Sequence, residues 1–168
     1  MAAERITRET VNHKLWELRP FLLTQNTANY TPEQHHVWVD RWCMPGIRRG
    51  DYRAYVWRNA AAIVGDAVVR IGDKKSTLAI RNFYIAEGQR GYGLGGALLA
   101  QVLDDALAFL RSRKAVAPHA THITIQTDVA AGSPDEVFFE RMGFDAVEAA
   151  NLYDPHKLDV MMERIIET

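Results

Sequence analysis

Apolar residues in the first quarter of this chain recur at the spacing of an α-helix. Between residues 10 and 24, one helical face gathers four of them: Val11, Leu15, Leu18 and Leu22. Pro20 lies within this segment and is expected to bend or end the helix. A second helix is predicted from Thr31, because Pro32 suits the first helical position and Thr31 forms a capping box with Gln34.

The second predicted helix carries three large or reactive side chains in its later part. Trp38 and Trp42 are four positions apart and are expected to share a face, which either packs in the core or lines a pocket. Cys43 is the only cysteine, so no internal disulfide can form, and a reducing cytoplasm suits the chain. We expect Cys43 to be a packed core thiol.

Beyond residue 50 the period changes to two, which predicts strands. Residues 52–57, 61–71 and 77–85 carry this pattern and are separated by short polar turns, as in an antiparallel meander. On the third segment, alternation separates two sets of side chains: Ile80, Asn82 and Tyr84 on one face, Arg81 and Phe83 on the other.

The helical period returns after residue 94, with one apolar stripe and charged residues outside it. The stripe consists of Leu98, Leu99, Val102, Leu103, Ala106, Leu107 and Leu110. A strand is predicted at residues 123–127. The helix after it begins at Ser133, which forms a capping box with Glu136, and Gly143 is placed to end it.

Two short strands, near residues 145–148 and 157–164, complete the order α-α-β-β-β-α-β-α-β-β. This order predicts an α/β (α+β) fold, a mixed and mostly antiparallel sheet with helices on both faces. A chain of 168 residues is expected to form a single domain over residues 1–168. Residues 1–9 show no convincing strand at the N-terminal edge.

Composition and charge narrow the classes of partner. A net charge of -1 argues against broad nucleic-acid binding, and we expect Arg48, Arg49 and Arg53 in a solvated loop. No apolar run approaches the length of a membrane span, and the charged N-terminus is unlike a signal peptide. His35 and His36 are adjacent and lack a cluster of other ligands, so no metal site is expected. We therefore expect a cytoplasmic protein with neither nucleic acid nor membrane as a partner.

The most informative segment lies between Ile85 and Leu99, where glycines crowd the start of the long helix. These glycines are Gly91, Gly93, Gly95 and Gly96. They leave backbone N–H groups bare and let a ligand approach the main chain. The helix N-terminus adds partial positive charge, and Arg90 adds a fork of donors for phosphate oxygens. The segment is therefore predicted to bind a phosphorylated ligand.

Two other phosphate-binding motifs fit this segment poorly. Gly91, Gly93 and Gly96 satisfy G-x-G-x-x-G, but several residues separate them from the strand, and residues 111–122 supply no acid at the expected distance. No G-x-x-x-x-G-K-[ST] sequence occurs, so a P-loop is excluded. A nicotinamide oxidoreductase remains the rival interpretation among dinucleotide-binding enzymes.

Two motifs in order carry a family resemblance. Residues 90–95 read Arg-Gly-Tyr-Gly-Leu-Gly, which has the form [QR]-x-x-G-x-[GA] between a strand and a helix. Residues 139–144 match an aromatic-x-x-x-Gly-Phe pattern at the exit of a short helix. Together they resemble the motifs of the GNAT superfamily of acetyl-CoA-dependent N-acetyltransferases, over roughly residues 76–163.

The resemblance implies acetyl-CoA as cosubstrate and the amine of a small molecule or peptide as acceptor, with a homodimer as the candidate assembly. In this family the amine attacks the thioester directly, main-chain groups at residues 83–85 hold the pantetheine arm, and the glycine loop holds the pyrophosphate. The implied cofactor-binding residues are Phe83, Ile85, Arg90, Gly91, Gly93, Leu94, Gly95, Gly96 and Phe139.

The catalytic groups depart from the family pattern. Phe139 stands where the family commonly has a tyrosine that protonates the leaving thiolate, and phenylalanine cannot donate a proton. Tyr153 is the candidate replacement, with His156 as a second. The strand beside the cofactor lacks the glutamate often found there, so Asn82 is a candidate for orienting a water. Tyr84 on the same strand is a further catalytic candidate.

The base is left open among Asp128, His35 and His36. Two functions follow from these residues. The first is acetyl transfer from acetyl-CoA to a primary amine by direct attack. The alternative is a catalytically weak or inactive regulatory module of the same fold that binds acyl-CoA.

Overall fold

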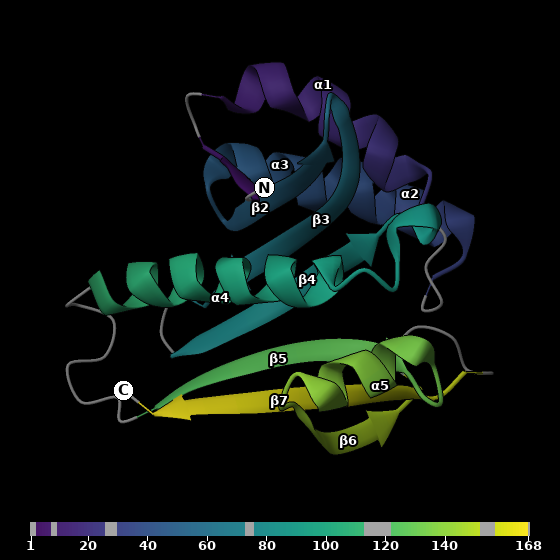
Figure 1. The fold of residues 1–168 in the computed structure, drawn as a ribbon, viewed down its shortest axis with the longest axis vertical. Helices are drawn as coiled ribbons and strands as arrows, with labels where there is room; N and C mark the ends of the chain where they lie inside the picture. The colour runs from purple at the N-terminus through teal and green to yellow at the C-terminus, as the bar shows by residue number, and fades with distance from the viewer. Residues whose placement is uncertain are drawn as a thin grey trace.

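The structure, a computed structural model, describes residues 3–7, 10–25, 30–72, 76–112, 122–151 and 157–167 (Figure 1). Its helices are α1 (Val11–Leu23), α2 (Pro32–Trp38), the π-helical η1 (Val39–Cys43), α3 (Met44–Arg49), the 3₁₀-helical η2 (Glu87–Gln89), α4 (Leu94–Ser112) and α5 (Pro134–Arg141). Its strands are β1 (Glu4–Ile6), β2 (Tyr52–Asn59), β3 (Ala62–Ile71), β4 (Thr77–Ile85), β5 (His122–Ala130), β6 (Asp145–Ala150) and β7 (Asp159–Glu167).

The strands form one seven-stranded sheet in the order β1-β2-β3-β4-β5-β7-β6. All neighbouring strands are antiparallel except β4 and β5, which pair in parallel. A parallel pair needs a crossover connection, and α4 supplies it. The predicted mixed, mostly antiparallel sheet is confirmed.

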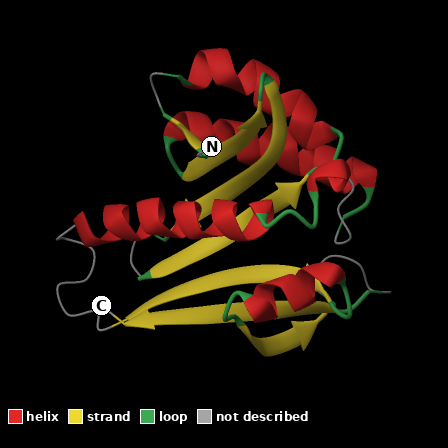
Figure 2. Ribbon diagram, viewed as in Figure 1, coloured by secondary structure: helices red, strands yellow, loops and turns green. Residues whose placement is uncertain are grey.

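Helices cover both faces of the sheet, as the alternating strands require (Figure 2). On one face, α4 and α5 pack on a core that includes Tyr55, Leu78 and Ile125. On the other, α1, η1 and α3 pack on Ala54 and Val56. The apolar stripe of α4 is buried as predicted, from Leu98 to Leu107, and the side chain of Leu110 lies outside the described part of the chain.

The N-terminal edge differs from the prediction, because residues 4–6 do form a strand. β1 pairs with β2 and buries Ile6. A three-residue strand is too short to show alternation, and pairing with β2 rather than local propensity stabilises it. The helix predicted over residues 10–24 is confirmed as α1, which continues through Pro20 to Leu23, so Pro20 does not end it.

The second predicted helix is interrupted by a wider turn. Its capping box between Thr31 and Gln34 is present, but η1 is a π-helix. Trp38 packs against the core while Trp42 is 59% exposed, so the expectation of one shared packing face is wrong. Cys43 is buried as expected, and burial raises the pKa of its thiol.

A β-bulge changes which side chains of β4 share a face. Val68 pairs with Asn82 and Val69 with Ile80, so Arg81 is the extra residue. Ile80 and Phe83 consequently pack on the α4 side, although strict alternation placed Ile80 with Asn82.

The arginine cluster is only partly solvated. Arg53 donates to Asp105 at 2.9 Å, and its guanidinium carbon lies 3.6 Å from the ring centroid of Phe109. Arg48 and Arg49 are exposed, as expected. Arg53 therefore links β2 to α4, contrary to the expectation of a solvated loop.

Candidate active site

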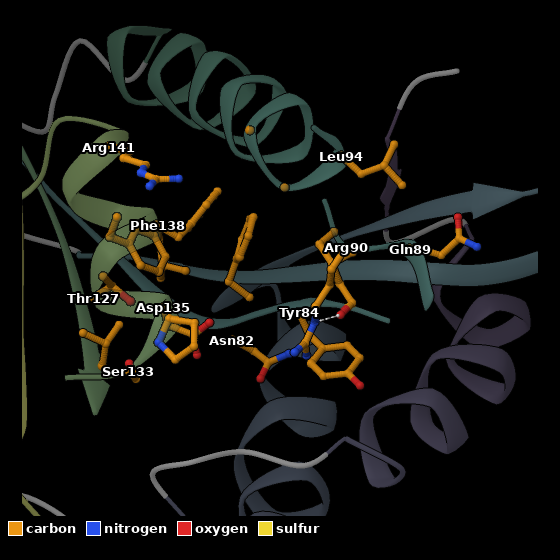
Figure 3. A pocket seen from close by; sticks show the side chains of 18 of the residues that line it. Asn82, Tyr84, Gln89, Arg90, Leu94, Thr127, Ser133, Asp135, Phe138 and Arg141 are labelled. Carbon is orange, nitrogen blue, oxygen red and sulfur yellow. Dashed lines mark hydrogen bonds between the residues drawn. The ribbon is translucent and has the colours of Figure 1, made fainter. Parts of the chain in front are cut away.

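The site lies where two parallel strands separate. β4 and β5 pair only as far as Ile80 and Thr127, and both strands continue beyond that pair. Within the described residues, the edge of β4 from Arg81 to Ile85 that faces β5 has no strand partner. A cavity of about 670 Å³ occupies this divergence (Figure 3).

The cavity reaches both faces of the sheet. Phe83, Phe138 and Phe139 line it on the side of α4 and α5. Asn82 and Tyr84 line it on the side of α1, where the ring of Tyr84 contacts that of Phe21 edge to face at 5.9 Å. Two reactants could therefore approach one another through the divergence from opposite faces.

The glycine loop forms one end of the cavity. Gly91 and Gly93 have φ of +83° and +78°, a region that side chains other than glycine's rarely adopt, and a Cβ at either would meet open space. The carbonyl oxygen of Gly93 accepts from the N–H of Ala97 in the first turn of α4. The N–H groups of the residues between them, 94–96, therefore have no partner within the helix. Such groups, with the helix dipole, suit an anion.

Arg90 has a structural contact as well as a place at the cavity. Its Nε donates to the carbonyl oxygen of Ile85 at 2.9 Å, and its guanidinium carbon lies 5.4 Å from the ring centroid of Tyr84. The contact fixes the loop against the end of β4. Arg90 also lines the cavity, where its guanidinium fork could bind a phosphate.

An aromatic cluster forms the wall between β4 and α5. Phe139 makes edge-to-face contacts with Phe83 at 5.8 Å and with Phe138 and Phe144, each at 5.1 Å. Its side chain is 3% exposed, so only its rim reaches the cavity. No hydroxyl is present at this position.

A buried polar network supports Asn82 from behind. Asn82 Nδ2 donates to Asp66 Oδ2 at 2.7 Å and to Gln25 Oε1 at 3.0 Å, and Gln25 Nε2 donates to Asp66 Oδ1 at 2.5 Å. Asp66 is fully buried on β3. Burial raises the pKa of its carboxyl to about 7, although the two amide hydrogen bonds act in the opposite direction.

The structure brings the predicted cofactor-binding residues together. Those lining the cavity are Phe83, Ile85, Arg90, Gly91, Gly93, Leu94, Gly95, Gly96 and Phe139. The catalytic candidates Asn82 and Tyr84 also line it, whereas Tyr153 and His156 lie outside the described residues.

The three candidates for the base differ in position. Asp128 lines the cavity and lies 4.0 Å from the guanidinium of Arg81. His35 is buried away from the cavity, and its Nε2 donates to the carbonyl of Leu22 at 2.7 Å. Burial lowers the pKa of His35, and His36 is exposed. Among these three, only Asp128 lies where a substrate could reach it.

Sequence reasoning missed several lining residues. Thr127 lies at the end of the parallel pairing, and Arg141 extends from the last turn of α5 toward the space beside α4 (Figure 3). Ser133 also lines the cavity while capping α5, where it accepts from the N–H of Glu136. The reciprocal half of the predicted capping box is replaced, because Glu136 accepts from Gly132. The position of residue 133 at a helix start was the available signal for its place in the site.

Comparison with known proteins agrees with this fold. A family model of the acetyltransferase (GNAT) domain matches residues 50–146. The structure is similar to a GNAT-family protein from Desulfovibrio desulfuricans, described as an acetyltransferase, with a TM-score of 0.68 and 21% identity over 99% of this chain and 98% of that chain. A search of curated proteins finds no match.

Two further solved structures share the fold. Arabidopsis thaliana Naa50, in complex with the bisubstrate analogue CoA-Ac-MVNAL, aligns with a TM-score of 0.66 and 16% identity over 98% of this chain and 99% of that one. A ribosomal-protein-alanine N-acetyltransferase from Brucella melitensis aligns with a TM-score of 0.58 and 18% identity over 99% and 100% of the two chains.

The fold is that of an acyltransferase domain, in which β4 and β5 separate beside a glycine loop. Because the family model covers more than half of the sequence, the chain belongs to the GNAT acetyltransferase family. Among the described helices, none is long and apolar enough to cross a membrane.

Proposed function

We propose that this chain transfers an acetyl group from acetyl-CoA to a primary amine by direct attack. The observation that carries the proposal is the single cavity that joins the glycine loop to the unpaired edge of β4. Its volume of about 670 Å³ is within the usual range for ligand sites. Anion-binding groups lie at one end, and exposed strand groups lie at the other.

Different residues of the cavity suit different parts of acetyl-CoA. The N–H groups at the start of α4, with Arg90 and Arg141, would bind the pyrophosphate, and Gly93 leaves room for it. The unpaired main chain of residues 83–85 would hydrogen-bond the pantetheine arm, as an added strand does. An N–H from the same edge would polarise the thioester carbonyl.

In the reaction, the amine nitrogen attacks the carbonyl carbon, a C–N bond forms and the C–S bond breaks. The sulfur takes the electron pair of that bond and one proton, and the nitrogen loses one proton, which gives an amide and CoA thiol. Positioning of the two reactants accounts for much of such catalysis. Asp128 is the candidate base, because it is the ionisable acceptor among the three candidates that lines the cavity.

Phe139 favours a second candidate function, a domain that binds acyl-CoA with little turnover. The aromatic cluster places no hydroxyl at the position where the family commonly has one. Losing general-acid catalysis costs about 10²–10⁴-fold in rate. A thiol with a pKa of ~8.5 is nevertheless a tolerable leaving group near neutral pH, which favours an active enzyme.

Ligand-dependent unfolding and thiol release test the proposal together. Acetyl-CoA at 100 times its Kd should stabilise the fold by ~2.7 kcal/mol, measured as a rise in Tm, and NAD or ATP should not. Thiol release in the presence of mixed primary amines should exceed the release without protein. Stabilisation without amine-dependent thiol release would support the regulatory module, and stabilisation by NAD alone would refute the proposal.

A further inference from the structure

Asp66 on β3 is a buried carboxylate that has no role in the acetyl transfer proposed for the cavity. It is fully buried and has no cationic partner among the residues that the structure describes. Its two oxygens accept from the side-chain amides of Gln25 and Asn82. A buried carboxylate without a counter-charge is costly, so a cation brought close to it would gain favourable interaction.

The network also fixes which way the Asn82 amide points. A carboxylate can only accept, so the nitrogen of Asn82 must face Asp66, and its second N–H goes to Gln25. The remaining atom, Oδ1, has no partner within the described part of the chain and belongs to a side chain that lines the cavity. The site therefore presents a fixed hydrogen-bond acceptor with negative charge directly behind it.

This acceptor lies on the face of the sheet opposite the aromatic cluster. Asn82 is on the α1 side with Tyr84, whereas Phe139 and α5 are on the other side. Two arginines that line the cavity have other contacts, since Arg81 lies 4.0 Å from Asp128 and Arg90 donates to the carbonyl of Ile85.

We propose that Asp66, Gln25 and Asn82 form the positioning site for the acceptor and select amines that are cationic in solution. The inference rests on the proposed acetyl transfer and assigns its acceptor half. The ammonium group binds through N–H donation to Asn82 Oδ1 and transfers one proton to Asp128, the candidate base, before its nitrogen attacks the thioester carbon. When the C–N bond forms, the nitrogen becomes positively charged again, and the Asn82 oxygen with Asp66 behind it stabilises that charge.

The test compares two amines of similar shape with different charge. Both amines are assayed at pH 8, above the pKa of about 7 that burial gives Asp66, so that the carboxyl is ionised. At this pH benzylamine is protonated and aniline is not, and each is assayed at saturating acetyl-CoA with uncatalysed transfer subtracted. The wild-type protein should have the higher kcat/KM for benzylamine. Asp66→Asn should raise KM for benzylamine and so lower its kcat/KM about tenfold or more. The kcat/KM for aniline and the Kd of acetyl-CoA should not change. Asp104→Asn, the same change at an exposed carboxylate of α4, should alter none of these values.

Two further variants separate positioning from folding. Asn82→Ala removes the cavity oxygen but leaves Asp66 bonded to Gln25, and it should also lose the benzylamine preference. Asp66→Asn combined with Asn82→Asp restores an amide–carboxylate pair and should recover part of that preference. Equal losses for both amines in all variants would show a structural role and overturn the inference, as would an unchanged preference in Asp66→Asn.

Failure of the proposed function has its own signature. A wild-type protein that does not bind acetyl-CoA in calorimetry refutes acetyl transfer itself. A wild-type protein that binds acetyl-CoA but acetylates benzylamine no faster than aniline overturns the assignment of the acceptor site.

Discussion

Replacement of Asp66 by asparagine should change how the stability of the protein depends on pH. Burial raises the pKa of this carboxyl from 3.8 to about 7. A raised pKa means that the folded state binds the proton more tightly than the unfolded state does. The resulting stability is complete below pH ~4 and is lost as the pH rises toward about 7.

The magnitude follows from the size of the shift. About three pKa units, at ~1.36 kcal/mol each, give a loss of roughly 4 kcal/mol of unfolding free energy between pH ~4 and ~7. Asparagine cannot titrate, so Asp66→Asn lacks this loss. The difference in unfolding free energy, variant minus wild type, should therefore rise by about that amount over the range and stay level above it.

Urea denaturation at a series of pH values, followed by tryptophan fluorescence, measures this difference. Groups that titrate in both proteins contribute equally to the two unfolding free energies, so their contributions cancel in the difference. One is Asp40, whose pKa is lowered by the hydrogen bond from Arg19 and which contributes the opposite slope. Asp104→Asn serves as the exposed control and should give a curve parallel to the wild type. A parallel curve for Asp66→Asn would refute the reasoning, because it would show that the carboxyl titrates alike in folded and unfolded chains.

The remaining predictions concern the cofactor end and the core. Gly93→Val should abolish acetyl-CoA binding in calorimetry because of its positive φ, whereas Gly88→Ala, which meets open space, should bind normally; normal binding by both would exclude the loop. Arg90→Ala should weaken binding by about 1.5–3 kcal/mol, and an unchanged Kd would assign the arginine to the contact with β4 alone. Phe139→Tyr should raise kcat modestly, at most toward the lower end of ~10²–10⁴-fold, with little change in acetyl-CoA affinity; an unchanged kcat would show that protonation is not limiting. Leu98→Ala, at a fully buried position of α4, should lower the unfolding free energy by ~2–5 kcal/mol, and a loss below ~1 kcal/mol would contradict its place in the core.

The sequence predicts the parts of the fold that depend on residues close to one another in the chain. The stripe of α4 shows helical periodicity over many residues, and the cap at Thr31 needs only residues three positions apart. The glycine loop is equally local, since the positive φ of Gly91 and Gly93 requires glycine wherever it occurs. These local features predict the family and the residues that line the glycine-loop end of the cavity.

The proposed acceptor site depends on contacts between distant segments, and local pattern does not record them. Gln25 follows α1, whereas Asp66 and Asn82 lie on two strands, and no spacing in the sequence connects the three. The bulge at Arg81 reverses the facing of side chains on β4, which only the pairing with β3 reveals.

Within the sheet, the short pairing between β4 and β5 is the join between two parts. Four residue pairs, from Thr77–Thr124 to Ile80–Thr127, connect the part formed by β1–β4 to the part formed by β5–β7. The core under α4 and α5 includes residues of both parts, whereas the core under α1 and α3 includes described residues of the β1–β4 part only. A ligand that contacts both α4 and α5 would link the two parts of the sheet and stabilise the join between them. Amide hydrogen exchange at this join should therefore slow when acetyl-CoA binds, by more than it does in the centre of β3, so that the join between the two parts reports occupancy of the site.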